Sequence, residues 1–218
     1  MALDQSIEEY VRAGFIGIWL KTHEQDEAIH EIKKVLCKRF PPTSHGEVDE
    51  KGDPVSNGAW VTCTWDAQNE LQGPDSVLRS QIVVDAGKKL GQPATLFTIL
   101  PEMAEQAGNT TLLLVLKNWH RKDFAENTML IQCIQNLVAV GKGLNDFGFN
   151  LIFLAPTAKV PSDLEKHLVV VEHELPNKEV LWDMAKELSD QSGAVLPDNP
   201  EAQMLIQESA SGLTRYEA

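Results

Sequence analysis

Apolar runs alternate with amphipathic stretches over most of the chain. A strand buried on both faces of a parallel sheet is a continuous apolar run, whereas a helix that covers a sheet has apolar residues three and four positions apart. The alternation predicts an α/β fold with three layers, in which helices cover both faces of a mainly parallel, five-stranded sheet. The expected strands are residues 14–21, 59–65, 111–116, 149–156 and 168–175.

Helices are expected between these strands. A capping-box pattern, Thr22 with Gln25 three residues later, predicts that the first of them begins at Thr22. Pro101 is expected to break or kink another, because proline lacks the N–H that a helix interior uses. The polar segment 41–58 is expected to be a mobile loop, and 73–92 an irregular piece with a short helix or strand pair. The expected helices are 2–12, 22–39, 94–106, 126–140, one that begins after Asn177, and 200–209.

The character of the chain changes after Pro176, and this change predicts two domains, residues 1–176 and 177–218. Asn177 is suited to cap the helix that follows it. Thr214 and Glu217 form another capping-box pattern, but the chain stops before the helix that they would begin. We therefore expect the natural chain to continue past Ala218.

The net charge narrows the choice of partners. It is -13 at pH 7, which makes a nucleic acid unlikely as the main ligand, since binding to phosphates is built from Lys and Arg. Apolar runs of membrane-spanning length and a signal peptide are both lacking, so a cytoplasmic protein without membrane contact is expected. The three cysteines are widely spaced and show no metal-site pattern, which predicts reduced thiols.

The turn after the first expected strand lacks the chemistry of a phosphate site. Such a turn needs glycines that let the backbone wrap an anion, and a Gly-Lys-Ser/Thr ending, as in GxxxxGK[ST]. The sequence here contains no glycine and brings three carboxylates to the start of the helix, which would repel a polyphosphate. We therefore predict a blocked phosphate turn and no cofactor in this chain. Its residues are Thr22, His23, Glu24, Asp26 and Glu27.

The end of the strand 111–116 lacks a metal-binding acid in the same way. A nucleotide hydrolase would carry an aspartate there to hold Mg²⁺, and this chain has Asn118, whose amide is uncharged. His120 and Arg121 follow and complete a vestigial polar cluster rather than a catalytic one. We expect no catalytic residue and no metal site here. Asp66, at another strand end, is suited to a general base or to capping its own turn, and we favour the cap.

Other candidate groups are assigned to structure. His23 and His30 lie seven residues apart and lack the spacing of a metalloprotease motif, which favours a surface pair. The tryptophans in apolar runs are expected in the core. These are Trp19, Trp60 and Trp182.

Several segments in a fixed order resemble one family. They are FIGIWLKTHEQDEAIHEI, VTCTWDAQNEL, LLLVLKNWH, FNLIFLAP, VPSDLEKHLVVVEHELP and ASGLTRYEA. The chain resembles, over residues 13–218, the N-terminal half of the AAA-type ATPases of the conserved hypothetical chloroplast reading frame family, which occurs in plastids and bacteria.

The resemblance implies a degenerate domain of the P-loop NTPase (AAA+) type, followed by a partial helical lid at 177–218. In such proteins a downstream domain carries the ATP and Mg²⁺ site. Asn118 would then occupy the Walker B position, where relatives have Asp, and Gln132 and Gln135 stand where relatives have arginines. An interface role for those arginines is therefore in doubt in this chain, and Val160 replaces a usual leucine.

These observations predict a non-catalytic AAA+-like N-terminal module of a larger, oligomeric ATPase. Its partners would be its own downstream AAA+ module, neighbouring subunits and protein clients, contacted through the strand ends and the segment 41–58. Two alternatives stay open. One is a self-sufficient ATP-binding AAA+ hydrolase with an atypical phosphate loop. The other is a stand-alone protein-binding adaptor, which a stop codon after Ala218 would favour and a downstream GxxxxGK[ST] would exclude.

Overall fold

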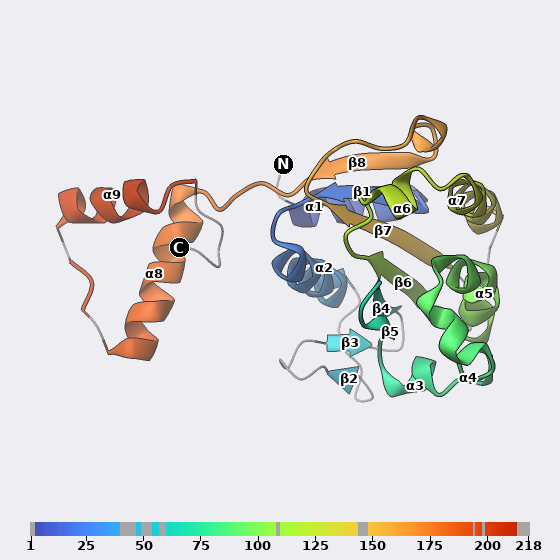
Figure 1. Cartoon of the computed structure of the whole chain (residues 1–218). Coiled ribbons are helices and arrows are strands. Elements are labelled where there is room, and N and C mark those ends of the chain that lie inside the picture. Colours follow the sequence, from blue (N-terminus) through green and yellow to red (C-terminus); the bar gives the residue numbers. More distant parts are fainter. Residues whose placement is uncertain are drawn as a thin grey trace. The chain divides into compact units, whose positions relative to one another are not determined.

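The computed structural model describes most of the chain and divides it into two compact units, residues 1–173 and 174–218. In the first unit an α/β sheet is covered by helices on both faces, and the second unit is helical (Figure 1). The described residues are 3–39, 47–48, 54–56, 60–107, 110–143, 148–193, 195–197 and 199–212.

Five parallel strands form the centre of the sheet, in the spatial order β4-β6-β7-β1-β8. All five coincide with predicted strands, so the parallel α/β fold is confirmed. The first strand of the chain lies between the fourth and the fifth, and the carboxyl ends of all five share one edge. Their bounds are β1 Gly17–Lys21, β4 Trp60–Asp66, β6 Thr111–Leu116, β7 Phe149–Ala155 and β8 Leu168–Glu172.

Three short strands were not predicted, because runs of two or three residues are too short to show a period. β5 (Glu70–Gln72) returns antiparallel to the end of β4. β2 (Glu47–Val48) and β3 (Pro54–Ser56) extend the sheet beyond β4 within the expected loop 41–58, so the prediction of a loop was wrong for these five residues. The rest of 41–58 lies outside the described residues.

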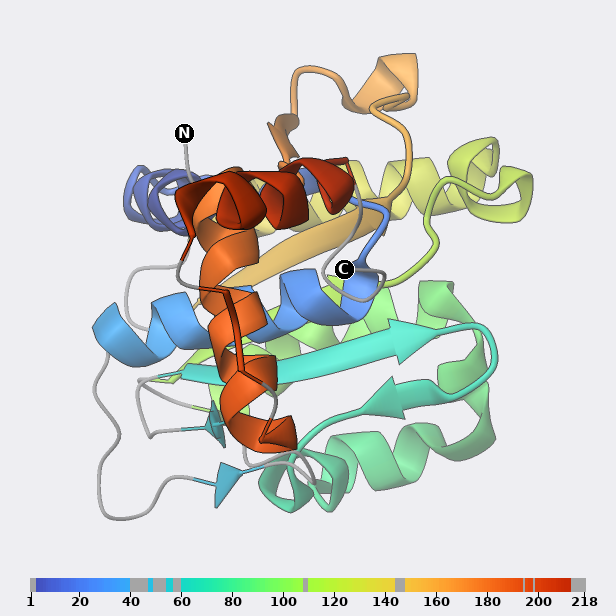
Figure 2. The ribbon, with the colours of Figure 1, turned by 90° about the vertical axis from the view of Figure 1, so that its left-hand side faces the viewer.

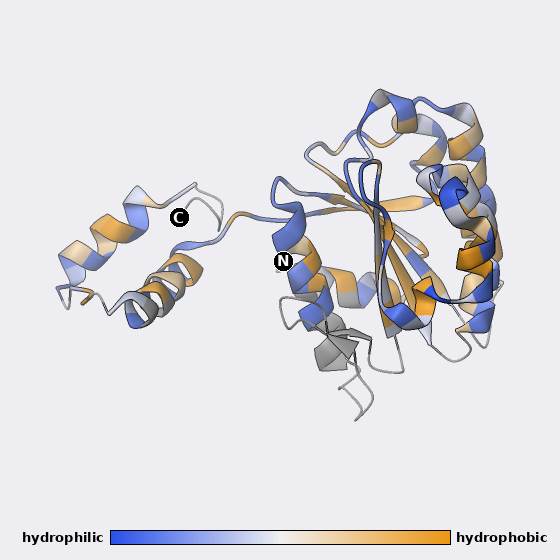
Figure 3. Cartoon of the chain, turned by 60° about the horizontal axis from the view of Figure 1, so that its bottom comes forward, coloured by the Kyte–Doolittle hydropathy of each residue, from blue (hydrophilic) through white to orange (hydrophobic). Residues whose placement is uncertain are grey.

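The two faces of the sheet have separate apolar cores. One face packs against the helices α1 (Leu3–Arg12) and α2 (Gln25–Arg39) through alternate strand residues such as Ile18, Leu113 and Ile152. The opposite face packs against α5 (Pro93–Gln106) and α7 (Thr128–Gly141) through residues such as Trp19 and Leu114. Figure 2 shows α2 across one face, and in Figure 3 the apolar colouring follows the strands. Of the tryptophans expected in the core, Trp19 and Trp60 are buried and Trp182 is half-buried.

The helices of the first unit match the predicted ones at most positions. The irregular segment 73–92 contains two short helices and a 3₁₀ turn. The bounds are α1 Leu3–Arg12, α2 Gln25–Arg39, α3 Asp75–Leu78, α4 Gln81–Ala86, η1 Gly87–Gly91, α5 Pro93–Gln106, α6 Lys122–Ala125, α7 Thr128–Gly141 and η2 Ser162–Leu164.

Two details of these helices correct the sequence analysis. α2 begins at Gln25 rather than Thr22, because the Thr22 N–H still donates to Ala155 O of β7, at 2.8 Å. Thr22 thus ends the sheet ladder and does not cap the helix, so the predicted capping box was wrong. α5 continues through Pro101, so of the two expected outcomes, a break or a kink, the break was wrong.

Cysteine usage agrees with reduced thiols in the described part of the chain, where Cys63 and Cys133 are free. Cys63 is fully buried at the centre of β4, and burial raises the pKa of its thiol to about 12. The side chain of Cys37 lies outside the described residues.

The second unit contains α8 (Lys178–Ser192) and α9 (Pro200–Ser209). Asn177 caps α8 as predicted, because its side-chain oxygen accepts from the N–H groups of Glu179 and Val180 at 3.0 Å each. The predicted helix at 200–209 is also confirmed. The Thr214 and Glu217 pattern lies outside the described residues.

Candidate functional site

A cleft of about 630 Å³ opens at the carboxyl ends of the parallel strands. Three segments line it: the turn after β1 with the start of α2, the turn between β4 and β5, and the segment that follows β6. Parallel α/β sheets bind their ligands at this edge. The lining side chains with polar or aromatic groups are His23, Gln25, Asp26, Asp66, Gln68, Asn69, Lys117, Asn118, Arg121 and Phe124.

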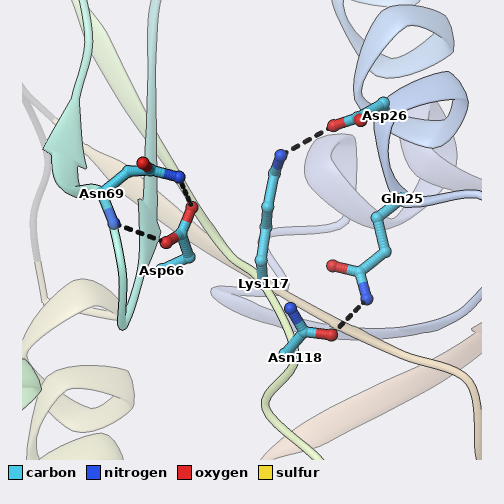
Figure 4. Close-up of polar contacts among 6 residues, drawn as sticks. All are labelled: Gln25, Asp26, Asp66, Asn69, Lys117 and Asn118. Carbon is cyan, nitrogen blue, oxygen red and sulfur yellow. Dashed lines mark hydrogen bonds and ion pairs between the residues drawn. The ribbon is translucent and has the colours of Figure 1, made fainter.

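Two contacts across the cleft join the start of α2 to the end of β6 (Figure 4). Gln25 Nε2 donates to Asn118 Oδ1 at 2.9 Å, and Lys117 Nζ lies 2.7 Å from Asp26 Oδ1. We refer to these four residues as the clasp. The two residues of each pair are more than 90 positions apart in the sequence. The clasp connects the start of α2, where a phosphate would be sought, with the end of β6, where a metal ion would be sought.

The backbone fixes the direction of the Asn118 side chain. Asn118 adopts a left-handed conformation, with φ of 57°, which asparagine tolerates better than most residues. Its neighbours are anchored to different strands, since Lys117 N–H donates to Trp65 O of β4 and Trp119 N–H donates to Leu154 O of β7. Trp119 is fully buried and stacks on Phe124. The aromatic core beneath the cleft therefore holds the residues that present Asn118.

Asp66 caps its own turn, as predicted. Its Oδ1 accepts from the N–H groups of Gln68 at 2.8 Å and Asn69 at 2.7 Å, and its Oδ2 accepts from the Asn69 side chain at 3.0 Å. Burial by itself would raise the pKa of Asp66. The hydrogen bonds from Asn69 and Gln68, aided by the positive charge of Lys117, outweigh burial and hold the pKa below its usual value of 3.8. An ionised carboxylate held by three donors suits a structural cap better than a general base.

The predicted phosphate turn is occupied by contacts within the protein. The buried Thr22 hydroxyl accepts from the Glu24 N–H at 3.0 Å and shares a hydrogen bond with His173 Nδ1 at 2.9 Å. Asp26 is exposed and paired with Lys117, whereas Glu24 and Glu27 are half-buried. Of the five predicted turn residues, His23 and Asp26 face the cleft.

The predicted cluster after β6 is only partly assembled. Asn118 and Arg121 line the cleft, and the Arg121 N–H donates to Asn118 O at 3.3 Å. His120 is half-buried, is not among the lining residues, and its Nδ1 has no hydrogen-bond partner among the described residues.

Gln135, which stands where arginines were noted in relatives, has a contact inside the domain. Its Nε2 donates to Asp163 O of the η2 turn at 2.9 Å, and Gln132 bonds to Asn136 along α7. Gln135 therefore tethers the connection between β7 and β8.

The described ranges contain no group of three or more His, Cys, Asp or Glu side chains arranged to hold a metal ion. Nor do they contain a helix long and apolar enough to cross a membrane.

Sequence reasoning missed part of the site. It assigned Gln25 to a capping box, and it passed over Lys117, although Lys117 directly precedes Asn118 at the strand end. The contacts of His173 were also missed, because they depend on the pairing of β8 with β1.

The first unit has a parallel sheet that is covered on both faces and has a polar cleft at its carboxyl edge, and its matches to a family and to solved structures show a P-loop, AAA+-like fold. The chain belongs to the family described as "SpoVK-like AAA ATPase, N-terminal domain", which matches residues 3–173. An N-terminal domain of an AAA-type ATPase is thus confirmed, while the narrower chloroplast reading frame family stays a prediction.

Solved structures show the same fold at low sequence identity. PCH-2 from C. elegans has a TM-score of 0.53 and 10% identity over 98% of this chain and 60% of that chain. A chain of the HORMA:CdnC:Trip13 complex from E. coli MS115-1 has a TM-score of 0.50 and 10% identity over 90% of this chain and 58% of that chain. The present chain thus spans about three fifths of each. No curated protein matches it.

Proposed function

We propose that the first unit is a non-catalytic module of a larger AAA-type ATPase, which serves assembly, regulation and protein contacts and does not bind or hydrolyse ATP by itself. The observation that carries this proposal is the clasp. A nucleotide seated as in an active P-loop domain would need the start of α2 for its phosphates and the end of β6 for its metal ion. Here the side chains from these two places bind each other.

Electrostatics supports the same conclusion. A helix N-terminus attracts an anion by about 0.3–1 kcal/mol at an exposed site. Two like unit charges 4 Å apart repel by about 1 kcal/mol in water and about 4 kcal/mol at an effective dielectric constant of 20. The carboxylates at 24, 26 and 27 therefore work against the attraction of the helix for a polyphosphate, and Lys117 pairs with that of Asp26.

The ATP and Mg²⁺ of the whole protein would be held elsewhere, in a downstream AAA+ module. The neighbours of known structure are longer than this chain, and one of them was solved in a complex that includes a HORMA protein. These facts support a module that works through protein partners, namely its own catalytic domain, adjacent subunits and protein clients.

A second candidate, direct nucleotide binding in an unusual pose, is favoured by one observation. The cleft has a volume typical of small-molecule sites, and the exposed Arg121 lines it together with Lys117 and the ring of Phe124.

Calorimetric titration of the 218-residue chain with ATP and Mg²⁺, and separately with ADP, tests both candidates. We expect no binding tighter than about 100 μM, which corresponds to about -5.5 kcal/mol. Saturable one-to-one binding with a dissociation constant below about 100 μM would contradict the non-catalytic module and favour the second candidate. Repeating the titration with Arg121→Ala would then show whether the cleft is the site.

A further inference from the structure

His173 occupies a junction in the fold. It is the last residue of the first unit, directly after β8, and the connection to the helical unit begins at Glu174. Its backbone N–H donates to Lys21 O at 2.9 Å and so extends the pairing of β8 with β1 by one residue. The residue that ends the sheet is thus also the one from which the second unit continues.

The His173 ring bridges two other elements. Nδ1 lies 2.9 Å from the Thr22 hydroxyl, in the turn after β1, and Nε2 lies 3.4 Å from a carboxylate oxygen of Glu31 on α2. We call Thr22, His173 and Glu31 the His173 bridge. The two ring nitrogens thus contact different elements, Nδ1 the turn and Nε2 the helix.

The turn depends on the same hydroxyl. Thr22 Oγ1 accepts from the Glu24 N–H at 3.0 Å, so a continuous series of hydrogen bonds runs from the backbone of the turn through Thr22 to the His173 ring. Thr22 is 1% exposed, and the His173 and Glu31 side chains are 5% and 18% exposed. Water therefore cannot readily replace a lost partner, and breaking one contact leaves a buried polar group unsatisfied.

Other charged groups near the bridge are engaged on neighbouring elements. Lys21 at the end of β1 pairs with Glu172 at the end of β8. This exposed pair flanks the backbone contact between β1 and His173 without using the ring. The ring thus links the turn to the junction through contacts of its own.

We propose that His173 is a positioning residue that couples the conformation of the turn 22–24 to that of the connection 174–177. A partner that displaces Thr22 removes the hydrogen bond at Nδ1 and loosens the first residues of the connection. A change in the connection that withdraws the His173 ring frees the Thr22 hydroxyl and loosens the turn. This coupling is independent of whether the turn binds a nucleotide.

Hydrogen exchange measured by mass spectrometry on the full chain tests the coupling in both directions. Thr22→Val should raise exchange at the His173 amide, which donates to Lys21 O at the start of the connection, and His173→Ala should raise exchange at the Glu24 amide. Each rise should be about fivefold, the factor that corresponds to one ordinary hydrogen bond. His173→Ala keeps the backbone bond to Lys21, so it reports on the ring alone. Thr22→Ser retains the hydroxyl and should restore wild-type exchange at the His173 amide.

His167→Ala is the matched control, because His167 stands at the other end of β8 and is not part of the bridge. It should change neither region, and peptides from β6 should stay at the wild-type rate in all variants. The proposal is overturned if Thr22→Val leaves exchange at the His173 amide unchanged, if His167→Ala produces the same rises, or if exchange also rises across β6, which would report general loosening of the domain.

Discussion

Asn118 combines three constraints at one position. It ends the β6 segment with a left-handed backbone, it accepts a hydrogen bond from Gln25, and it lacks the charge that a metal-binding strand end would supply. The first two constraints explain how an amide is held at the cleft. The third explains why we assign the position a structural role.

Replacing Asn118 separates its backbone and side-chain contributions. Asn118→Ala should lower the free energy of unfolding by about 2 kcal/mol, about half from the lost hydrogen bond and half from the left-handed conformation. Asn118→Gly loses the same hydrogen bond without that conformational cost, so it should be about 1 kcal/mol more stable than the Ala variant. Urea denaturation measures both. Equal stability of the two variants would show that the left-handed backbone carries no cost.

Asp66 should contribute to stability in a pH-dependent way. The pKa of Asp66 in the folded protein lies below its usual value of 3.8. The Asp66 carboxylate therefore contributes fully to stability above its usual pKa and loses this contribution as the pH falls through its pKa in the folded protein. Asp66→Asn keeps an oxygen acceptor but cannot be ionised. The stability advantage of the wild type over this variant should therefore be largest above about pH 5 and shrink below about pH 4.

Denaturant unfolding at several pH values between about 3 and 6 measures this advantage. Asp163→Asn serves as the control, because Asp163 is exposed on the η2 turn. A wild-type advantage over Asp66→Asn that stays constant across the range would contradict the assignment.

Whether the contacts of a single residue could be predicted depended on how far away its partners lie in the sequence. The cap formed by Asp66 was predictable, because its partners lie two and three positions away. The clasp was not, because a hydrogen-bonding pattern across 93 residues leaves no trace in either segment alone. The sequence predicted that Asn118 and Asp26 do not suit a nucleotide, but it did not predict that their side chains form the clasp.

At the scale of elements, four of the five parallel strands, β1, β4, β6 and β7, were predictable because they are buried on both faces, whereas β8, at the edge of the sheet, was predictable from its apolar run although Val170 is exposed. The apolar runs of the buried strands follow directly from that burial, as in β7, where all seven residues are buried. The start of α2 was not predictable, since the capping residues obeyed the local pattern while Thr22 was retained by the sheet. Pairing between distant strands thus overrode a local helix signal.

The return from β4 to β5 supplies a test at this scale. A Cβ on Gly73 would lie 2.7 Å from Cys63 Sγ in the core of β4. Gly73→Ala should therefore cost about 1–3 kcal/mol in the free energy of unfolding, the usual effect of overpacking. In the Cys63→Ala background the sulfur is absent, so the same substitution should cost at least about 1 kcal/mol less.

Thermal or urea denaturation of the four proteins in this cycle measures the coupling between the two sites. Gly148→Ala is the matched control, because a Cβ there would meet no atom within 4 Å. Strictly additive effects of Gly73→Ala and Cys63→Ala would show that the sulfur contact does not limit the packing of β5.

At the scale of the whole molecule, the chain combines an AAA+-like α/β unit with a helical unit and spans about 60% of the PCH-2 chain of the same fold. The fold class was predictable from the order of the helices and strands. The presence or absence of nucleotide binding and hydrolysis was not, since one fold can serve many functions. We propose that the function depends on the cleft and that the clasp is its deciding feature.

The most direct test of that claim is a crystal structure of the chain soaked in ADP or a non-hydrolysable ATP analogue with Mg²⁺. We predict that the hydrogen bond between Gln25 and Asn118 and the pair between Asp26 and Lys117 persist, with no phosphate at the turn. A β-phosphate seated against the backbone amides of residues 22–26, with the clasp opened, would contradict the account.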